Sequence, residues 1–97
     1  MDDVYVVYML KCADATLYIG VTNDMARRLH SHNTLKSGAK YTRARRPVRL
    51  VYQEVCATKG EALKREFALK QLSRQDKIAL IDQMDSSTAP FDGSLHL

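Results

Sequence analysis

The chain has 97 residues, of which 45% are hydrophobic and 27% charged, so one folded domain is expected and global disorder is excluded. The formal net charge of +4 favours anionic partners, and the longest apolar run, residues 4–10, is too short to cross a membrane. Cys12 and Cys56 lack the spacing of a zinc site and the acidic N-terminus is unlike a secretory signal, so we expect free thiols in a cytoplasmic protein.

The first part of the chain predicts a β-hairpin followed by a helix. Residues 4–10 are β-branched and aromatic throughout, which is typical of a central strand covered on both faces. A short link leads into residues 17–21, so the two strands are expected to pair as antiparallel neighbours. Thr22 or Asn23 is the expected N-cap of a helix that ends near residue 32, with Asp24 in its first turn.

The second part predicts another strand and two more helices. Residues 48–56 have a strand pattern. Thr58 is followed three residues later by a glutamate, which is a capping box and predicts a helix over residues 59–72. Ser73 is the expected cap of a further helix that reaches about residue 84.

The predicted order is therefore β-β-α-β-α-α, an α/β (α+β) domain in which helices pack on the faces of a three-stranded antiparallel sheet. This domain is expected to cover residues 1–84. Residues 33–47 are expected to form a polar, basic connection without regular structure, and residues 85–97 to form a flexible C-terminal tail.

Positive charge is concentrated between Lys11 and Arg49. This stretch holds nine basic and two acidic residues, a net charge of +7, so the rest of the chain carries −3. Such a basic half is the usual electrostatic pattern of nucleic-acid binding, although a solvated basic loop has the same charge.

One segment of this stretch combines an aromatic residue with cations that would contact phosphates while the aromatic ring stacks on a base. The alternative is a flexible basic loop without a ligand. The residues are Lys40, Tyr41, Arg43, Arg45 and Arg46.

Tyr8 and Tyr18 are expected to share one face of the hairpin. If Lys11 opposes Leu17, paired residue numbers sum to 28, and residues of equal parity then lie on the same side. Two phenols there could orient or deprotonate a water molecule. The alternative is a pair of ordinary core tyrosines.

Arg28 precedes His32 by four residues, so the two side chains share a helix face. A guanidinium matches the geometry of phosphate oxygens, but Arg28 could equally be a solvated helix charge. On a helical wheel Glu66 falls among apolar positions, so it could bind a divalent cation at the edge of the core. The alternative is an ion pair between Glu66 and Lys70.

Taken together, these segments resemble the GIY-YIG nuclease superfamily, and in particular its small, single-domain bacterial branch. Tyr18-Ile19-Gly20 is the second signature tripeptide intact, and Val6-Val7-Tyr8 occupies the place of the first. The likeness covers residues 4–81. Its matching segments are residues 7–14, 17–24, 27–29, 32–33, 38–47, 65–66 and 70–74.

The resemblance implies an endonuclease that hydrolyses phosphodiester bonds, in DNA in preference to RNA, with DNA repair or recombination as the setting. It implies catalytic roles for Tyr8 and Tyr18, phosphate binding by Arg28, and one Mg²⁺ or Mn²⁺ ion held by Glu66. No small-molecule cofactor and no membrane partner are expected. Supporting roles are expected for Lys11, His32 and Tyr41.

The sequence departs from the family pattern near its end. Many catalytic relatives carry an asparagine there, whereas this chain reads Met84-Asp85-Ser86. Two alternatives to a nuclease therefore stand: a non-catalytic nucleic-acid-binding module, and a domain whose basic face meets an acidic protein.

Overall fold

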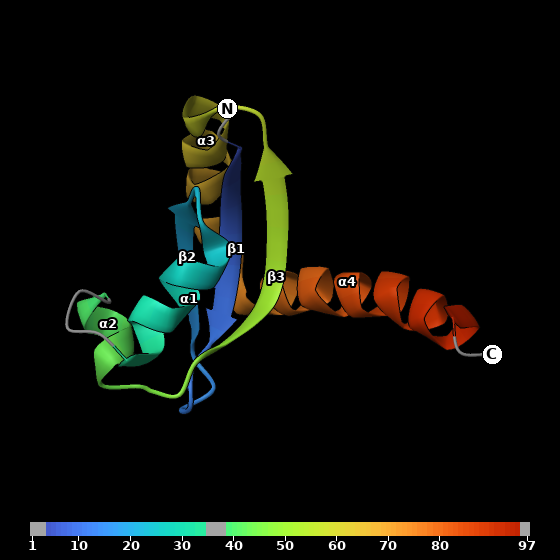
Figure 1. Cartoon of the computed structure of the whole chain (residues 1–97), viewed down its shortest axis with the longest axis horizontal. Helices are drawn as coiled ribbons and strands as arrows, with labels where there is room; N and C mark the ends of the chain where they lie inside the picture. Colours follow the sequence, from blue (N-terminus) through green and yellow to red (C-terminus); the bar gives the residue numbers. More distant parts are fainter. Residues whose placement is uncertain (1–3, 35–38, 96–97) are drawn as a thin grey trace.

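The computed structural model describes residues 4–34 and 39–95, and side chains as far as Met84. The elements in chain order are β1 (Tyr5–Lys11), β2 (Leu17–Thr22), α1 (Met25–Thr34), α2 (Lys40–Arg43), β3 (Arg49–Cys56), α3 (Lys59–Lys70) and α4 (Arg74–Leu95). The predicted order is confirmed, with the short helix α2 added (Figure 1).

The sheet has the strand order β2-β1-β3, and both pairs are antiparallel. The first strand is thus central, as its unbroken run of apolar residues predicts. Lys11 pairs with Leu17 and Tyr8 with Gly20, so the expected hairpin register is confirmed. The pairing of β1 with β3 contains an irregularity between Met9 and Leu10.

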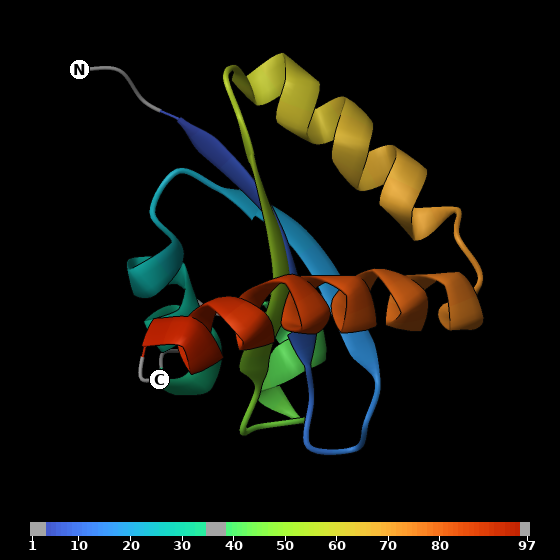
Figure 2. The ribbon, with the colours of Figure 1, turned by 90° about the vertical axis from the view of Figure 1, so that its right-hand side faces the viewer.

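Helices cover both faces of the sheet, because alternate residues of β1 point to opposite sides. On one face Tyr8 and Leu10 pack with Met25 and Leu29 of α1. On the other face Val7 and Met9 belong to a core to which α3 and α4 contribute, and the first half of α4 runs across the strands (Figure 2). The helical residues of this core are Ala62, Leu69, Leu80, Ile81 and Met84.

The cap of α1 differs from the prediction. The Asp24 carboxylate accepts a hydrogen bond from the Arg27 backbone N–H at 3.2 Å, and the Thr22 hydroxyl accepts one from the Asp24 N–H at 3.1 Å. The cap is therefore Asp24, not Thr22 or Asn23.

The caps of α3 and α4 are confirmed. The Thr58 hydroxyl accepts a bond from the Glu61 N–H at 3.1 Å, and the Ser73 hydroxyl accepts one from the Asp76 N–H at 3.1 Å. These bonds satisfy backbone donors that a helix start leaves without a partner.

Two stretches predicted to be irregular contain helix. Within the basic connection, α2 forms where the Thr42 side chain bonds to α1, a contact between segments that local patterns do not reveal. At the other end α4 continues to Leu95, past the predicted end near residue 84, because extending an existing helix costs less than starting one. No helix within the described ranges is long and apolar enough to span a membrane.

Candidate active site

A groove crosses β2 between α1 and α3, and it carries the four residues that the resemblance makes catalytic. Tyr8 and Tyr18 come from the sheet, Arg28 from α1 and Glu66 from α3. Residues from four elements that are up to 58 positions apart thus line one groove. The remaining lining residues are Tyr5, Gly20, Val21, Thr22, Asn23, Lys59 and Leu63.

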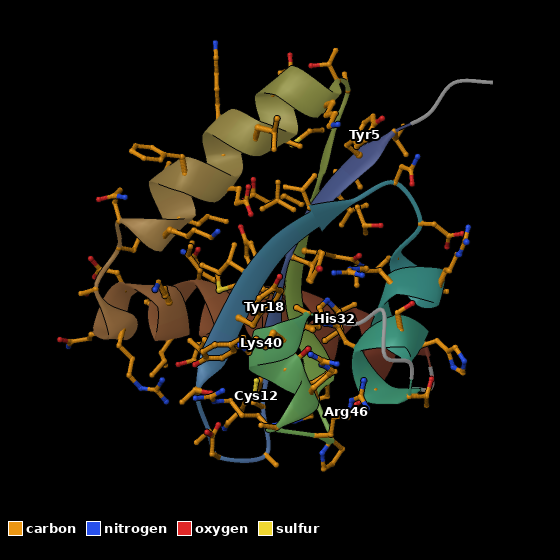
Figure 3. All side chains as sticks on the ribbon, turned by 90° about the vertical axis from the view of Figure 1, so that its left-hand side faces the viewer. Tyr5, Cys12, Tyr18, His32, Lys40 and Arg46 are labelled. Carbon is orange, nitrogen blue, oxygen red and sulfur yellow. The ribbon has the colours of Figure 1, made fainter. Side chains whose placement is uncertain are left out.

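The two tyrosines differ in exposure. Their ring centroids lie 6.4 Å apart on the same face of the hairpin, as the register requires. Tyr8 is 1% exposed, whereas Tyr18 is half-buried and stacks edgewise against His32 at 5.1 Å (Figure 3). Tyr18 therefore offers more surface to a ligand, while Tyr8 reaches the groove from inside the core.

The Tyr8 hydroxyl lies 2.9 Å from His32 Nε2. Burial raises the pKa of Tyr8 above its usual value of 10, and a hydrogen bond from Arg28 opposes that shift. The negative charge of the Glu66 carboxylate also acts to raise the pKa of Tyr8. The Tyr8 phenol is thus protonated at neutral pH.

His32 is fully buried, and its Nδ1 lies 2.8 Å from the Thr42 hydroxyl oxygen. Burial lowers the pKa of His32 to about 4, and the nearby cations Arg28 and Arg46 act in the same direction. The imidazole is therefore neutral at pH 7. The sequence gives no signal for Thr42, because nothing in the pattern of the basic connection links it to α1.

Glu66 takes part in both arrangements that the sequence left open. Its Oε2 lies 3.2 Å from Lys70 Nζ, so the ion pair on α3 exists. The same carboxylate lines the groove, and its charge reaches Tyr8. Lys59, one turn before Leu63 on α3, brings a further cation to the groove. The sequence alone does not indicate this role, because it depends on how α3 packs against β2.

The donor set of the groove fits a magnesium-like ion. Within the described ranges no cluster of three or more His, Cys, Asp or Glu residues could enclose a metal, and Glu66 is the one acid lining the groove. Mg²⁺ typically keeps several water ligands and uses one or two carboxylates together with substrate phosphates. Glu66 suits that role. The Asp85 side chain lies outside the described part of the structure.

The basic connection divides into two kinds of cation. Arg45 binds Asp14 at 3.1 Å and lies over the Tyr41 ring at 3.9 Å, and Arg46 donates to the backbone carbonyls of Ser31 and His32. Both arginines thus have partners within the domain. The exposed pair is Lys40 and Arg43, for which the described residues provide no ion pair.

The structure places the two remaining supporting candidates differently. The Tyr41 ring lies 5.9 Å from that of Tyr18, so it borders the tyrosine cluster. Lys11 instead lines a separate pocket with Arg49 and Ile78, on the far face of the sheet. Lys11 is not brought together with the groove residues.

Comparison with known proteins decides the family. A family model described as the GIY-YIG catalytic domain matches residues 4–79. This chain belongs to the GIY-YIG family. Within this GIY-YIG domain the two signature tripeptides lie side by side, on β1 and β2, and pair Tyr8 with Gly20.

Proteins similar to this chain occur in several bacteria. The UPF0213 protein DP2720 of Desulfotalea psychrophila is 55% identical over 75 residues, covering 77% of this chain and 68% of the relative. The UPF0213 protein SSP2268 of Staphylococcus saprophyticus is 51% identical over 81 residues, covering 84% and 98%. The names of these relatives state no reaction, so they identify no substrate.

Two solved structures share the GIY-YIG fold seen here. The solution structure of the UPF0213 protein BH0048 from Bacillus halodurans has 41% identity and a TM-score of 0.54, covering 82% of this chain and 84% of its own. The protein EF2693 from E. faecalis has 36% identity and a TM-score of 0.58, covering 87% and 91%. They support the sheet and helix arrangement described above.

A clasp on the far side of α3 fixes how this GIY-YIG domain presents Glu66. Arg65 Nε lies 2.8 Å from Glu54 Oε1 and 3.0 Å from Oε2, and Tyr52 donates its hydroxyl to the same carboxylate. Arg65 thus ties α3 to β3. Because Glu66 follows it by one residue, about 100° around the helix, the clasp turns Glu66 toward β2.

Proposed function

We propose that this domain hydrolyses phosphodiester bonds of nucleic acid, DNA in preference to RNA, in the groove across β2. The observation that carries the proposal is the meeting of Tyr8, Tyr18, Arg28 and Glu66 in that groove. Membership of the GIY-YIG family, a nuclease superfamily, supports it.

Arg28 and Lys59 face the groove from opposite sides and would bind the phosphate at the cleavage point. A guanidinium carries five N–H donors, so Arg28 can bond to Tyr8 and to a phosphate oxygen together. It would also stabilise the charge that develops on the phosphate during attack by water.

Tyr8 and Tyr18 would position the attacking water and take part in its deprotonation. The Tyr8 phenol is protonated at neutral pH, so its oxygen lone pairs would accept a hydrogen bond from the water. Tyr8 could take up the proton of the water only by passing its own proton to His32 Nε2, which lies 2.9 Å away. Glu66 would hold one Mg²⁺ or Mn²⁺ ion. When bound, that ion supplies Lewis-acid stabilisation of the reacting phosphate.

The test is a cleavage assay on labelled single-stranded, duplex and branched DNA and on RNA, with Mg²⁺, Mn²⁺ or a chelator. We expect metal-dependent cleavage by the wild type that Glu66→Gln abolishes. For Arg28→Ala we expect a loss of about a hundredfold to a thousandfold. Binding of the same substrates without cleavage under any condition would instead support a non-catalytic binding module.

Matched variants separate site chemistry from general effects of charge. Arg27 is an exposed neighbour of Arg28 on α1, so Arg27→Ala removes the same charge and should keep most of the cleavage activity. Lys70→Met breaks the ion pair but keeps the Glu66 carboxylate. If Lys70→Met and Glu66→Gln reduce cleavage equally, the ion pair and not a metal explains the requirement for Glu66.

A further inference from the structure

Two buried polar residues lie behind the groove and do not line it. His32 and Thr42 are both 0% exposed, and neither belongs to the lining residues. They form a row that starts at the groove: Tyr8 hydroxyl to His32 Nε2, 2.9 Å, and His32 Nδ1 to Thr42 Oγ1, 2.8 Å. The Thr42 hydroxyl continues the row to the Ala39 carbonyl at 2.9 Å.

The Thr42 end of the row gives it a direction. A hydroxyl has a single hydrogen, and Thr42 donates it to the Ala39 carbonyl, which can only accept. Thr42 must therefore accept from His32, so the proton of the imidazole is on Nδ1. In a neutral imidazole Nε2 is then an acceptor.

The Tyr8 end is compatible with the same direction. Arg28 acts on the pKa of Tyr8 as a hydrogen-bond donor, since a guanidinium can only donate. That bond uses a lone pair of the phenol oxygen, so the Tyr8 hydrogen is available for His32 Nε2. The Ala39 bond thus selects the tautomer of His32, and the Tyr8 end accommodates it.

We propose that Thr42 is a positioning residue that fixes His32 as the Nδ1–H tautomer and so turns the Tyr8 hydrogen away from the groove. The lone pairs of the Tyr8 oxygen then face Arg28 and the groove, ready to accept from water. Thr42 itself lies behind His32 and touches no reacting group. Its role in catalysis rests on the function proposed above, whereas the tautomer does not depend on it.

The protonation state of His32 agrees with this arrangement. Its pKa of about 4 keeps the ring neutral at pH 7, and only a neutral ring has an acceptor nitrogen for Tyr8. The opposite tautomer would place a hydrogen on Nε2. Tyr8 would then accept from His32 and direct its own hydrogen toward the groove.

The direct test is ¹⁵N NMR of the imidazole nitrogens in the intact protein, with His32 assigned by comparison with His32→Gln. We expect the wild type to carry its proton on Nδ1. Thr42→Val keeps the shape but removes the acceptor, so the proton should move to Nε2, and Thr42→Ser should restore Nδ1–H. A wild type protonated on Nε2 would overturn the proposal, and so would a folded Thr42→Val protein that keeps the proton on Nδ1.

Cleavage kinetics give the second readout. For Thr42→Val we expect a fall in kcat of about tenfold to a hundredfold, the range for partners that orient a functional imidazole, with little change in KM and rescue by Thr42→Ser. Equal kcat in wild type and Thr42→Val would overturn the catalytic role. If the wild type cleaves nothing yet shows the Nδ1–H tautomer, the proposed function fails while the assignment of the tautomer stands.

Discussion

Gly20 faces Tyr8 across the β1–β2 pair so closely that a Cβ at position 20 would lie 2.5 Å from the Tyr8 hydroxyl oxygen and 2.7 Å from Cζ. Real Cβ atoms essentially never approach another atom this closely. The glycine is thus needed for space, since the Tyr8 ring lies over the backbone of β2. The second signature tripeptide leaves room for the tyrosine of the first.

Gly20→Ala should therefore displace Tyr8. Because Tyr8 is buried and bonded to His32, we expect overpacking to lower the free energy of unfolding by about 1–3 kcal/mol and cleavage to fall with it. Chemical denaturation measures the first effect. Gly60→Ala is the matched control, because a Cβ there would meet nothing nearer than 3.9 Å. Equal stability of both variants would contradict the crowding argument.

Stability should depend on pH through His32. The unfolded chain takes up a proton on this imidazole below about pH 6.5, whereas the folded protein does so only near pH 4. The contribution of His32 to folding stability is therefore complete above pH 6.5, and up to about 3 kcal/mol of it is lost as the pH falls to 4. The measurement compares denaturation of the wild type with that of His32→Gln across this range. Parallel curves would show that His32 does not titrate as described.

The clasp between Arg65 and Glu54 should stabilise α3. Glu54→Gln removes the carboxylate charge that accepts three hydrogen bonds from Arg65. We expect the free energy of unfolding to fall by about 1–3 kcal/mol at pH 7. The hydrogen bond from Arg65 is the main cause that lowers the pKa of Glu54. The wild-type advantage should therefore persist below the usual glutamate pKa and disappear as the pH falls through the lowered one.

Lys64→Met is the control for this clasp, because Lys64 is exposed beside Arg65 and its replacement removes a charge without touching Glu54. Denaturant titrations of both variants at pH 7 and at acid pH separate the two effects. A Glu54→Gln protein as stable as the wild type at pH 7 would rule out a stabilising clasp.

Replacement of Lys40 and Arg43 by alanine should weaken nucleic-acid binding without unfolding the protein. Both are exposed, and removing each phosphate-binding cation should reduce the slope of log affinity against log salt by about one. Arg46→Ala should instead lower the free energy of unfolding by about 1–2 kcal/mol, because Arg46 donates to carbonyls of α1. An unchanged salt slope in the double variant would exclude this surface as the binding face.

Much of the groove followed from local rules. The short link between β1 and β2 fixed the register, and the alternation of the strands then put Tyr8 and Tyr18 together. The same alternation places the odd-numbered Lys11 on the opposite face, where the structure has it. The helical wheel of α3 places Glu66 at the edge of its apolar face, and in the structure this edge faces β2.

What the sequence did not reveal depends on contacts between distant segments. Thr42 meets His32 only after the basic connection folds back on α1, and α2 forms with that contact. The intramolecular partners of Arg45 and Arg46, which are Asp14 and the end of α1, were likewise not evident from the sequence. A charge pattern shows where cations are concentrated but not which of them also have partners within the domain.

The central position of β1 has a consequence for synthesis of the chain. On the ribosome β1 can pair with β2 almost at once, but its other edge stays unpaired until β3 emerges, since Tyr5 pairs with Cys56. At translation rates of about 5–20 residues per second this interval lasts roughly two to ten seconds. Nascent chains stalled before β3 should be protease-sensitive in β1, and those stalled well beyond α3 resistant. The central, apolar strand β1 is thus left with one unpaired edge until most of the domain has been synthesised.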